Sequence, residues 1–464
     1  MKLIIHRLIL LMLTLTHSET VLAMNLTDAS VEILEKNLQA AFPNLPAETT
    51  STLMQSGEAS LTLDDILGIA LRDNLGLKSK EAQQQSKQAS ATASFRKMLP
   101  TLSLSSSRSD ILHNTAPFGS EAETYNTTVT LSQPIYRGDS LWSGWKSANT
   151  QHVQAKLELI HAARTLIKDV KVTWNTLLEK KQLLKESEAA LERLHQHEKN
   201  AQAFFKEGRI WRNEVLQASV KVAEGEQNLI TAQNQVELAQ SQLNRLMRRP
   251  LDHPLQTKGD LNWMPLDWTL EKAYTHAKEH RTDLEKARLD IHVGKLTETS
   301  TASANLPSVN FNGTYNLAAP NMNYHENDAT LTATLNLNWT AWNWGQTTQE
   351  VAAAKANTYR NQLTYDDQLQ AVLLETRQAF LSAKESNSKV QLLKKSLGQA
   401  EENYRVNQIR YREQLGSATD VLNAMDLLTS TRNANTSALT AYLNAMAVLD
   451  LAVGKGAENM EIKP

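Results

Sequence analysis

Residues 331–340 read LTATLNLNWT, and this stretch decides the fold class of the chain. Apolar side chains occupy every odd position and uncharged polar side chains occupy every even position. A period of two is typical of a β-strand with one apolar and one polar face. A strand of a soluble sandwich alternates in the same way, so the pattern alone leaves a soluble sheet and a membrane barrel open.

Two further parts of the chain carry the same alternation. Residues 309–317, which follow Pro307, alternate throughout, with Gly313 on the apolar side. In the first half of the chain the apolar positions are Val129, Leu131 and Ile135, opposed to Thr128, Thr130 and Ser132. We therefore predict two pairs of strands, at about 100–137 and 306–342. The polar positions of the second pair include Asn310, Asn312, Asn336 and Asn338.

The chain is a tandem duplication. At a constant shift of 207 positions, Thr62-Leu63, Ala70, Leu77, Leu99-Pro100 and Gly138 recur as Thr269-Leu270, Ala277, Leu284, Leu306-Pro307 and Gly345. At a shift of 206, Glu214-Val215-Leu216 and Ala218 recur as Asp420-Val421-Leu422 and Ala424. One deletion accounts for the change. We predict two structural repeats, at 61–247 and 268–454, with a proline-containing linker at 248–267.

Long helices fill the rest of each repeat. Only 16 glycines and 11 prolines interrupt 464 residues, and apolar side chains recur every seven residues. These are Val215, Val222, Leu229, Val236 and Leu243, matched by Val421, Leu428, Asn435, Tyr442 and Leu449, and also Val170, Leu177, Leu184 and Leu191. Residues three further along are small, namely Ala218, Gly225, Ala232 and Ala239, matched by Ala424, Thr431, Ala438 and Ala445. Small residues allow neighbouring helices to approach closely. We expect these helices to face long helices at about 139–206 and 346–411, each about 100 Å long.

Composition excludes several classes of function. The 48 basic and 50 acidic residues give no electrostatic footprint for nucleic acid. The absence of cysteine excludes disulfides, cysteine-ligated metals and a lipidated N-terminal cysteine. No nucleophile elbow, phosphate-binding loop or zinc-protease pattern occurs, and His195 and His197 point to different sides of a helix. We therefore expect no enzymatic activity, no cofactor and no metal site.

The N-terminal segment resembles a signal peptide. Lys2 and Arg7 precede an apolar run at residues 8–15, and Val21-Leu22-Ala23 offers a cleavage site. Residues 1–23 are expected to be removed, 24–60 to form a poorly ordered arm and 455–464 to form a C-terminal tail. No later stretch is apolar enough for a transmembrane helix.

These features together resemble the TolC family of outer-membrane factors, from about residue 60 to 454. The resemblance rests on Leu99-Pro100 and Leu306-Pro307, on Gln133-Pro134-Ile135-Tyr136 before Gly138, on Trp342-Asn343-Trp344-Gly345, and on two turn patterns, Phe205-x-x-Gly208 and Tyr411 through Asp420-Val421-Leu422-x-Ala424. It implies a mainly α protein with a membrane β-barrel: a trimer in which each protomer gives four strands to a twelve-stranded barrel, continued by a periplasmic helical tunnel. Four strands cannot close on themselves in lipid, which independently requires several copies. Closure would turn the apolar side chains to lipid and the asparagines to the lumen.

The resemblance also implies partners and a gate. The protomer would act as a passive exit channel in the bacterial outer membrane, with a periplasmic adaptor and an inner-membrane ABC or proton-driven transporter. Polypeptide secretion and small-molecule efflux stay open as its task. The residues expected at the helix tips, about 205–213 and 411–419, and at the constriction are Phe205, Gly208, Glu214, Tyr411, Arg412, Gly416, Asp420 and Asn423.

Two alternatives remain open at this point. Asp420 matches a constriction acid of the family, yet an acid there also favours a helix N-terminus. A periplasmic structural or adhesive coiled-coil protein with a small soluble β-domain also fits the heptads.

One departure from the family is clear, because Gly416 stands two positions later than the usual glycine after Tyr411. We therefore expect the second tip to differ in geometry from the first.

Overall fold

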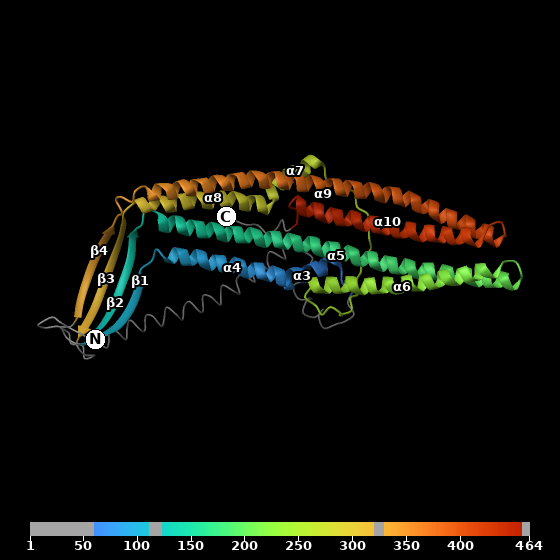
Figure 1. The fold of residues 1–464 in the computed structure, drawn as a ribbon, viewed down its shortest axis with the longest axis horizontal. Coiled ribbons are helices and arrows are strands. Elements are labelled where there is room, and N and C mark those ends of the chain that lie inside the picture. Colours follow the sequence, from blue (N-terminus) through green and yellow to red (C-terminus); the bar gives the residue numbers. More distant parts are fainter. Residues whose placement is uncertain (1–59, 111–122, 320–328, 457–464) are drawn as a thin grey trace. The chain divides into compact units, whose positions relative to one another are not determined.

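The computed structural model describes residues 60–110, 123–319 and 329–456. The expected signal peptide, the arm up to residue 59 and the tail from residue 457 lie outside these ranges. The helices are α3 (Leu63–Asp73), α4 (Leu75–Arg96), α5 (Ser140–Lys206), α6 (Arg212–Leu246), α7 (Leu270–His280), α8 (Thr282–Ala302), the 3-10 turn η1 (Ser303–Asn305), α9 (Gln346–Arg412) and α10 (Ala418–Ala452). The strands are β1 (Thr101–Asp110), β2 (Glu123–Tyr136), β3 (Ser308–Ala319) and β4 (Ala329–Asn338) (Figure 1).

The duplication predicted from the sequence is confirmed in the order and length of the elements. Helices α5 and α9 have 67 residues each, and α6 and α10 have 35 each. Thr62 and Thr269 both accept a backbone hydrogen bond as N-caps of α3 and α7. The strand pair Thr101–Ser132 corresponds to Ser308–Asn338, so the shift is 207 from β1 to β3 and 206 from β2 to β4. Asp139 and Gly345, both at positive φ, also correspond at 206, so the deletion precedes β4.

The chain divides into two compact units. The hairpin unit comprises the described residues up to Lys78, Ile160–Arg281 and those from Val372 onward. The sheet unit comprises Ser79–Leu159 and Thr282–Ala371. Both long helices run through both units. Among the described residues, no helix is long and apolar enough to cross a bilayer.

The four strands form one antiparallel sheet in the order β1-β2-β3-β4 (Figure 1). A β-bulge interrupts the pairing of β2 with β3, where Pro134 pairs with Asn310 and Tyr136 pairs with Val309. Ile135 is the extra residue of this bulge. Proline cannot donate to a ladder, which is why bulges tolerate it.

Strand β4 ends earlier than its alternation predicts. Its last residue, Asn338, pairs with Ser308, the first residue of β3. Pro307 precedes Ser308 and has no N–H to extend the ladder. Trp339 instead donates its indole N–H to the carbonyl of Asn305 at 3.0 Å.

The apolar and small residues that recur every seven positions form one buried face of α6, here called its seam, as predicted. Ala218, Gly225, Ala232 and Ala239 are buried, as are Val222, Val236 and Leu243. A Cβ built on Gly225 would approach Leu194 Cδ1 of α5 to 3.0 Å, so the two helices are as close as their backbones and side chains allow. In α10 the seam is buried at Val421, Ala424, Leu428, Tyr442 and Leu449. Ala438 and Ala445 are half-buried.

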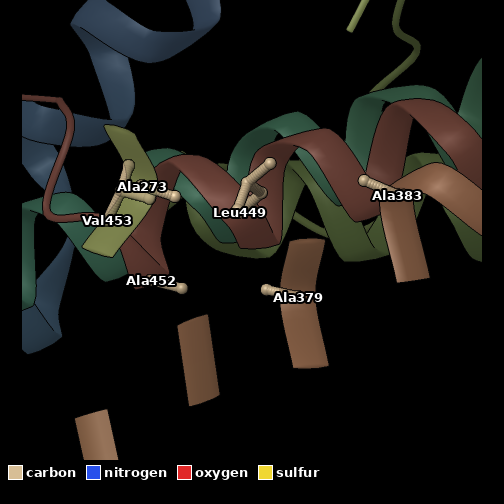
Figure 2. Packing of buried hydrophobic residues seen from close by; sticks show 6 residues of the cluster. All are labelled: Ala273, Ala379, Ala383, Leu449, Ala452 and Val453. Atoms are coloured by element: carbon tan, nitrogen blue, oxygen red, sulfur yellow. The ribbon is translucent and has the colours of Figure 1, made fainter. Parts of the chain in front are cut away.

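A second alanine-rich core joins the base of the second hairpin. Ala273 of α7, Ala379 and Ala383 of α9, and Leu449, Ala452 and Val453 at the end of α10 pack together (Figure 2). Four of these six residues are alanine and one is valine. The three helices therefore meet with little side-chain volume between them. The linker at 248–267 contains no helix or strand beyond a single bridge of Thr257 with Leu61.

Enlarging the seam of α6 should separate its helices. Ala232→Leu adds three carbons where the side chain is only 9% exposed, and we expect the free energy of unfolding to fall by about 1–3 kcal/mol. Gln235→Leu, three residues along on the exposed side, should change it by less than about 0.5 kcal/mol. Equal melting temperatures for the two variants would contradict this packing.

Candidate functional site

The sheet has one uncharged polar face. Because partners across an antiparallel sheet lie on the same side, the register aligns the polar positions of all four strands. These are Thr101, Ser132, Asn312 and Thr334 in one row, Ser103, Thr130, Thr314 and Thr332 in the next, and Ser105, Thr128, Asn316 and Thr330 in a third. The four asparagines singled out in the sequence belong to this face, where Asn310 pairs with Asn336 and Asn338 with Ser308.

Hydrogen bonds connect this polar face across the middle of the sheet. Thr128 Oγ1 donates to Asn316 Oδ1 at 2.7 Å, and Ser132 Oγ donates to Asn312 Oδ1 at 2.8 Å. Both bonds link the first repeat, on β2, to the second repeat, on β3. Side-chain bonds of this kind fix the pairing of strands that come from different halves of the chain.

The opposite face of the sheet is apolar and exposed. Its rows are Leu102, Leu131, Gly313 and Ala333, then Leu104, Val129, Tyr315 and Leu331, with Phe311 opposite Leu335 and Val309 opposite Leu337. Leu331 is 78% exposed and Leu335 is 65% exposed. A soluble sheet would bury such a face against a second layer. Within the described part of the sheet unit, no layer covers it.

The helix tips have the same backbone geometry in both repeats. After α5, Gly208 (φ +73°) donates to the carbonyl of Phe205 and Arg209 donates to that of Phe204, both at 2.9 Å. After α9, Gln414 (φ +63°) donates to Tyr411 at 3.1 Å.

The next residue completes the second tip. Leu415 donates to the carbonyl of Arg410 at 2.7 Å, so both tips form a Schellman motif. The expected difference in geometry is therefore absent. Gln414 takes the left-handed conformation itself, although Gly416 is displaced, because the two closing hydrogen bonds require that conformation at this position.

Asp420 caps a helix. Its carboxylate accepts the backbone N–H of Ser417 at 3.0 Å, and its own N–H donates to Ser417 Oγ at 3.2 Å, which completes a capping box at the start of α10. These bonds lower the pKa of Asp420, first through the backbone N–H of Ser417. The side chain is exposed and carries its charge at neutral pH. In the first repeat, Trp211 is the N-cap and makes no side-chain hydrogen bond.

Tyr411 lies at the second tip but is buried. It packs with Ala418, Val421 and Met425, and its ring centroid lies 5.3 Å from that of His197 on α5. Burial raises the pKa of Tyr411, with a further contribution from Glu214, and burial lowers the pKa of His197.

Two polar atoms of this tip core are unsatisfied. Among the described residues, neither Tyr411 Oη nor His197 Nε2 has a hydrogen-bond partner. The other residues predicted at the tips are exposed or half-buried: Phe205, Gly208, Arg412 and Asn423 are exposed, and Glu214 and Gly416 are half-buried.

A partly buried ionic cluster behind the tips, centred on the buried Glu186, was not anticipated from the sequence. Glu186 of α5 accepts hydrogen bonds from Arg193 at 2.6 Å and from Arg432 of α10 at 3.2 Å. Arg432 also donates to Glu401 of α9 at 2.9 Å, and Arg193 donates to Thr429 at 3.2 Å. The cluster joins three long helices. Its one sequence signal is the seven-residue spacing of Glu186 and Arg193, which places both on one helix face.

Within the residues that the structure describes, no group of three or more histidine, aspartate or glutamate side chains is arranged to hold a metal ion.

Comparisons with known proteins agree with this geometry. The sequence model of a family described as outer membrane efflux protein matches residues 66–247 and 273–455, which are the two repeats. No curated protein sequence matches the chain significantly.

Solved structures of the same fold come from several bacteria. The Campylobacter jejuni CmeC outer membrane channel is 18% identical, with a TM-score of 0.77, over 86% of this chain and 87% of its own. The Vibrio cholerae outer membrane protein VceC is 16% identical, with a TM-score of 0.74, over 85% and 97%. The open state of the Neisseria gonorrhoeae MtrE outer membrane channel is 16% identical, with a TM-score of 0.74, over 86% and 90%.

The shared backbone geometry of the two tips predicts opposite changes in the free energy of unfolding for substitutions at Gln414 and Gly208. Gln414→Gly should raise the free energy of unfolding by about 0.5–1 kcal/mol, because glycine adopts a positive φ without the cost that other residues incur. Gly208→Gln should lower it by a similar amount, and a Cβ there meets no atom within 4 Å, so the effect is conformational alone. Thermal unfolding of both variants checks the signs. A shift in the same direction for both would refute the equivalence of the tips.

Proposed function

Because the chain belongs to the outer membrane efflux protein family, we propose that three copies form the exit channel of an export machine. The protein is located in the bacterial outer membrane, with its helices in the periplasm. Its expected role is that of a passive conduit for cargo crossing that membrane.

The exposed apolar face of the sheet carries this proposal. Strands β1 and β4 each have one partner among the described strands, so each leaves one row of backbone groups unpaired. Hydrocarbon offers no hydrogen bonds to such groups, and only a closed barrel satisfies them. Three sheets of four strands would close into twelve. Leu331 and Leu335 would then face lipid, and Asn312 and Asn316 would face a water-filled lumen.

The polar face suits a lumen for a second reason. Over its three central rows it carries only serine, threonine and asparagine, so it offers hydrogen bonds without fixed charge. Such a lining does not select strongly between cations and anions. The chain would depend on partners for energy: a periplasmic adaptor and an inner-membrane ABC or proton-driven transporter. Polypeptides and small toxic molecules are both compatible with these uncharged rows, beyond which Arg137 donates to Asn310 Oδ1 at 3.2 Å.

The gate is proposed at the helix tips, with Asp420 lining the constriction. Its capping bonds and a role in the gate are compatible, since the bonds keep the carboxylate charged and the side chain is exposed. Three-fold symmetry would make a ring of three carboxylates. Asn423, one turn on and also exposed, would add a neutral ring where the family pattern has a second acid, which weakens attraction for cations.

Extraction distinguishes the channel from a periplasmic scaffold. A barrel embedded in the outer membrane should require detergent and migrate as a trimer. Release of the protein by osmotic shock alone would instead support a soluble coiled-coil protein.

The assignment of one sheet face to lipid and the other to the lumen predicts different trimer yields for substitutions at the neighbouring residues Leu335 and Asn336. Leu335→Arg should place a cation against hydrocarbon at a cost of about 2–4 kcal/mol per protomer near the midplane and reduce trimer yield. Asn336→Arg, the adjacent residue on the polar face, should narrow the lumen and leave trimer yield unchanged. Trimer in outer-membrane extracts is quantified by native electrophoresis. Equal yields would count against the assignment of the two faces.

The gate is tested by single-channel conductance in planar bilayers. A trivalent cation added on the side of the tips should block the wild type and fail to block Asp420→Ala, since the carboxylate ring is gone. Ser417→Ala is the matched control, because it removes the capping hydroxyl and leaves the charge, so block should persist. Asn423→Asp should restore a second acidic ring and strengthen block. If wild type and Asp420→Ala respond alike, Asp420 serves only as a helix cap.

A further inference from the structure

We propose that His197 of α5 makes the helix tips sensitive to pH, because protonation of its buried imidazole loosens the tip core and favours opening of the channel. The tip core is the group of side chains formed by His197, Tyr411, Ala418, Val421 and Met425. The inference rests on the proposed function in placing the gate at the tips. The effect of the proton on the packing of the tip core does not depend on that role.

His197 lies almost completely out of contact with solvent. It is 3% exposed, and Tyr411 of α9, whose ring centroid lies 5.3 Å away, is 6% exposed. Among the described residues, neither His197 Nε2 nor Tyr411 Oη has a hydrogen-bond partner. Such a site tolerates a neutral imidazole, whereas an imidazolium ion would hold a second N–H donor and a full charge away from water.

The surroundings of the tip core offer little compensation for a charge on His197. The titratable and charged residues that act on the tip core, or flank His197 on its own helix, are Arg193 and Glu198 on α5, Glu214 on α6, and Tyr404, Tyr411 and Arg412 on α9. Helix α10 contributes apolar side chains. Burial raises the pKa of both tyrosines, so they stay uncharged. The arginines carry the same sign as an imidazolium ion, and Glu198 already accepts a hydrogen bond from Ser219.

Linkage between protonation and packing fixes the direction of the effect. Burial lowers the pKa of His197 below the ordinary histidine value of about 6.5. The imidazole therefore takes up a proton more readily when the tip core is open to water. As the pH falls below about 6.5, opening becomes more favourable, by up to about tenfold per pH unit in each protomer. Well above that pH both states hold a neutral imidazole, and the pH has no effect through this group.

His197 is the one buried histidine of the two described tips. His195 is exposed, and no other histidine occurs in residues 162–252 or 326–464. The equivalent of His197 in α9, at a shift of 206, is the exposed Asn403, and the equivalent of Tyr411 in α5 is the exposed Phe205. The fold of a hairpin therefore does not require this histidine, whose ordinary pKa suits it to respond between pH 5 and 8.

The test follows hydrogen–deuterium exchange of the full-length protein in detergent at about pH 7.5 and about pH 5.5, on either side of the ordinary histidine pKa. After correction for the intrinsic exchange rate at each pH, peptides covering 197–213 and 411–425 should open up to about tenfold more often at the lower pH. A peptide covering 229–243 of α6, which contains no histidine, should not change.

Substitution identifies the group that takes up the proton. His197→Phe keeps an aromatic ring in the tip core and His197→Gln keeps a neutral polar group, and both should abolish the pH dependence. His195→Gln and Glu214→Gln are the controls and should respond as the wild type does, since the first removes an exposed histidine and a glutamate titrates near pH 4.3, below the range used. If either variant of His197 keeps the full response, or if the wild type shows none, the proposal is wrong.

Single-channel recording separates this inference from the proposed function. In planar bilayers the open probability should rise on acidification in the wild type and in His195→Gln, and stay constant in His197→Gln. An equal open probability of the wild type at both pH values would refute the link between the tip core and the gate. If no variant conducts at either pH, the channel function itself fails, while the exchange measurement still decides whether His197 loosens the tip core.

Discussion

Backbone hydrogen bonding in a medium without water is the constraint on which the rest of this structure depends. A four-stranded sheet with an exposed apolar face has two edges, and each edge strand holds a row of N–H and C=O groups that lipid cannot satisfy. The chain supplies only two strands per repeat. Duplication gives four, and symmetric association is the route that removes the remaining edges. Side chains from both repeats, such as Thr128 and Asn316, bond across the joint between them, so the duplicated halves act as one sheet.

The two repeats have kept backbone geometry where they have lost sequence. All four C-termini of α5, α6, α9 and α10 end in a left-handed residue, at Gly208, Arg248, Gln414 and Gly454. In each repeat one of the two is glycine and the other is not, and the order is reversed between the repeats. Gly454 could not be replaced easily, since a Cβ there would lie 2.9 Å from the carbonyl carbon of His280. The hydrogen bonds that close the helix, rather than the residue type, have been retained.

The sequence alone predicted the helices, the strands and their apolar faces. Periods of two and seven residues are local patterns, so they can be read without knowing which elements pack together. The alternation of residues 331–338 and the small residues of α6 are both found as expected. The error lies where the partner strand sets the end of the ladder. Trp339 continues the alternation but leaves the ladder, because Pro307 before β3 cannot extend it. This effect is not visible in the residues of β4 itself.

The candidate site was predictable to a lesser degree. Asp420 could be placed at a helix start from its motif alone, whereas the burial of Tyr411 depends on helices that are distant in sequence. The Glu186 cluster draws on three helices for the same reason. Tyr411 and His197 each hold a polar atom away from water with no partner. Such a group costs about 1–3 kcal/mol while it stays buried. The tip core around Tyr411 and His197 is therefore expected to unfold locally more readily than the alanine-rich cluster of Ala273 and Leu449, none of whose members is among the described residues with an unpaired buried side-chain atom.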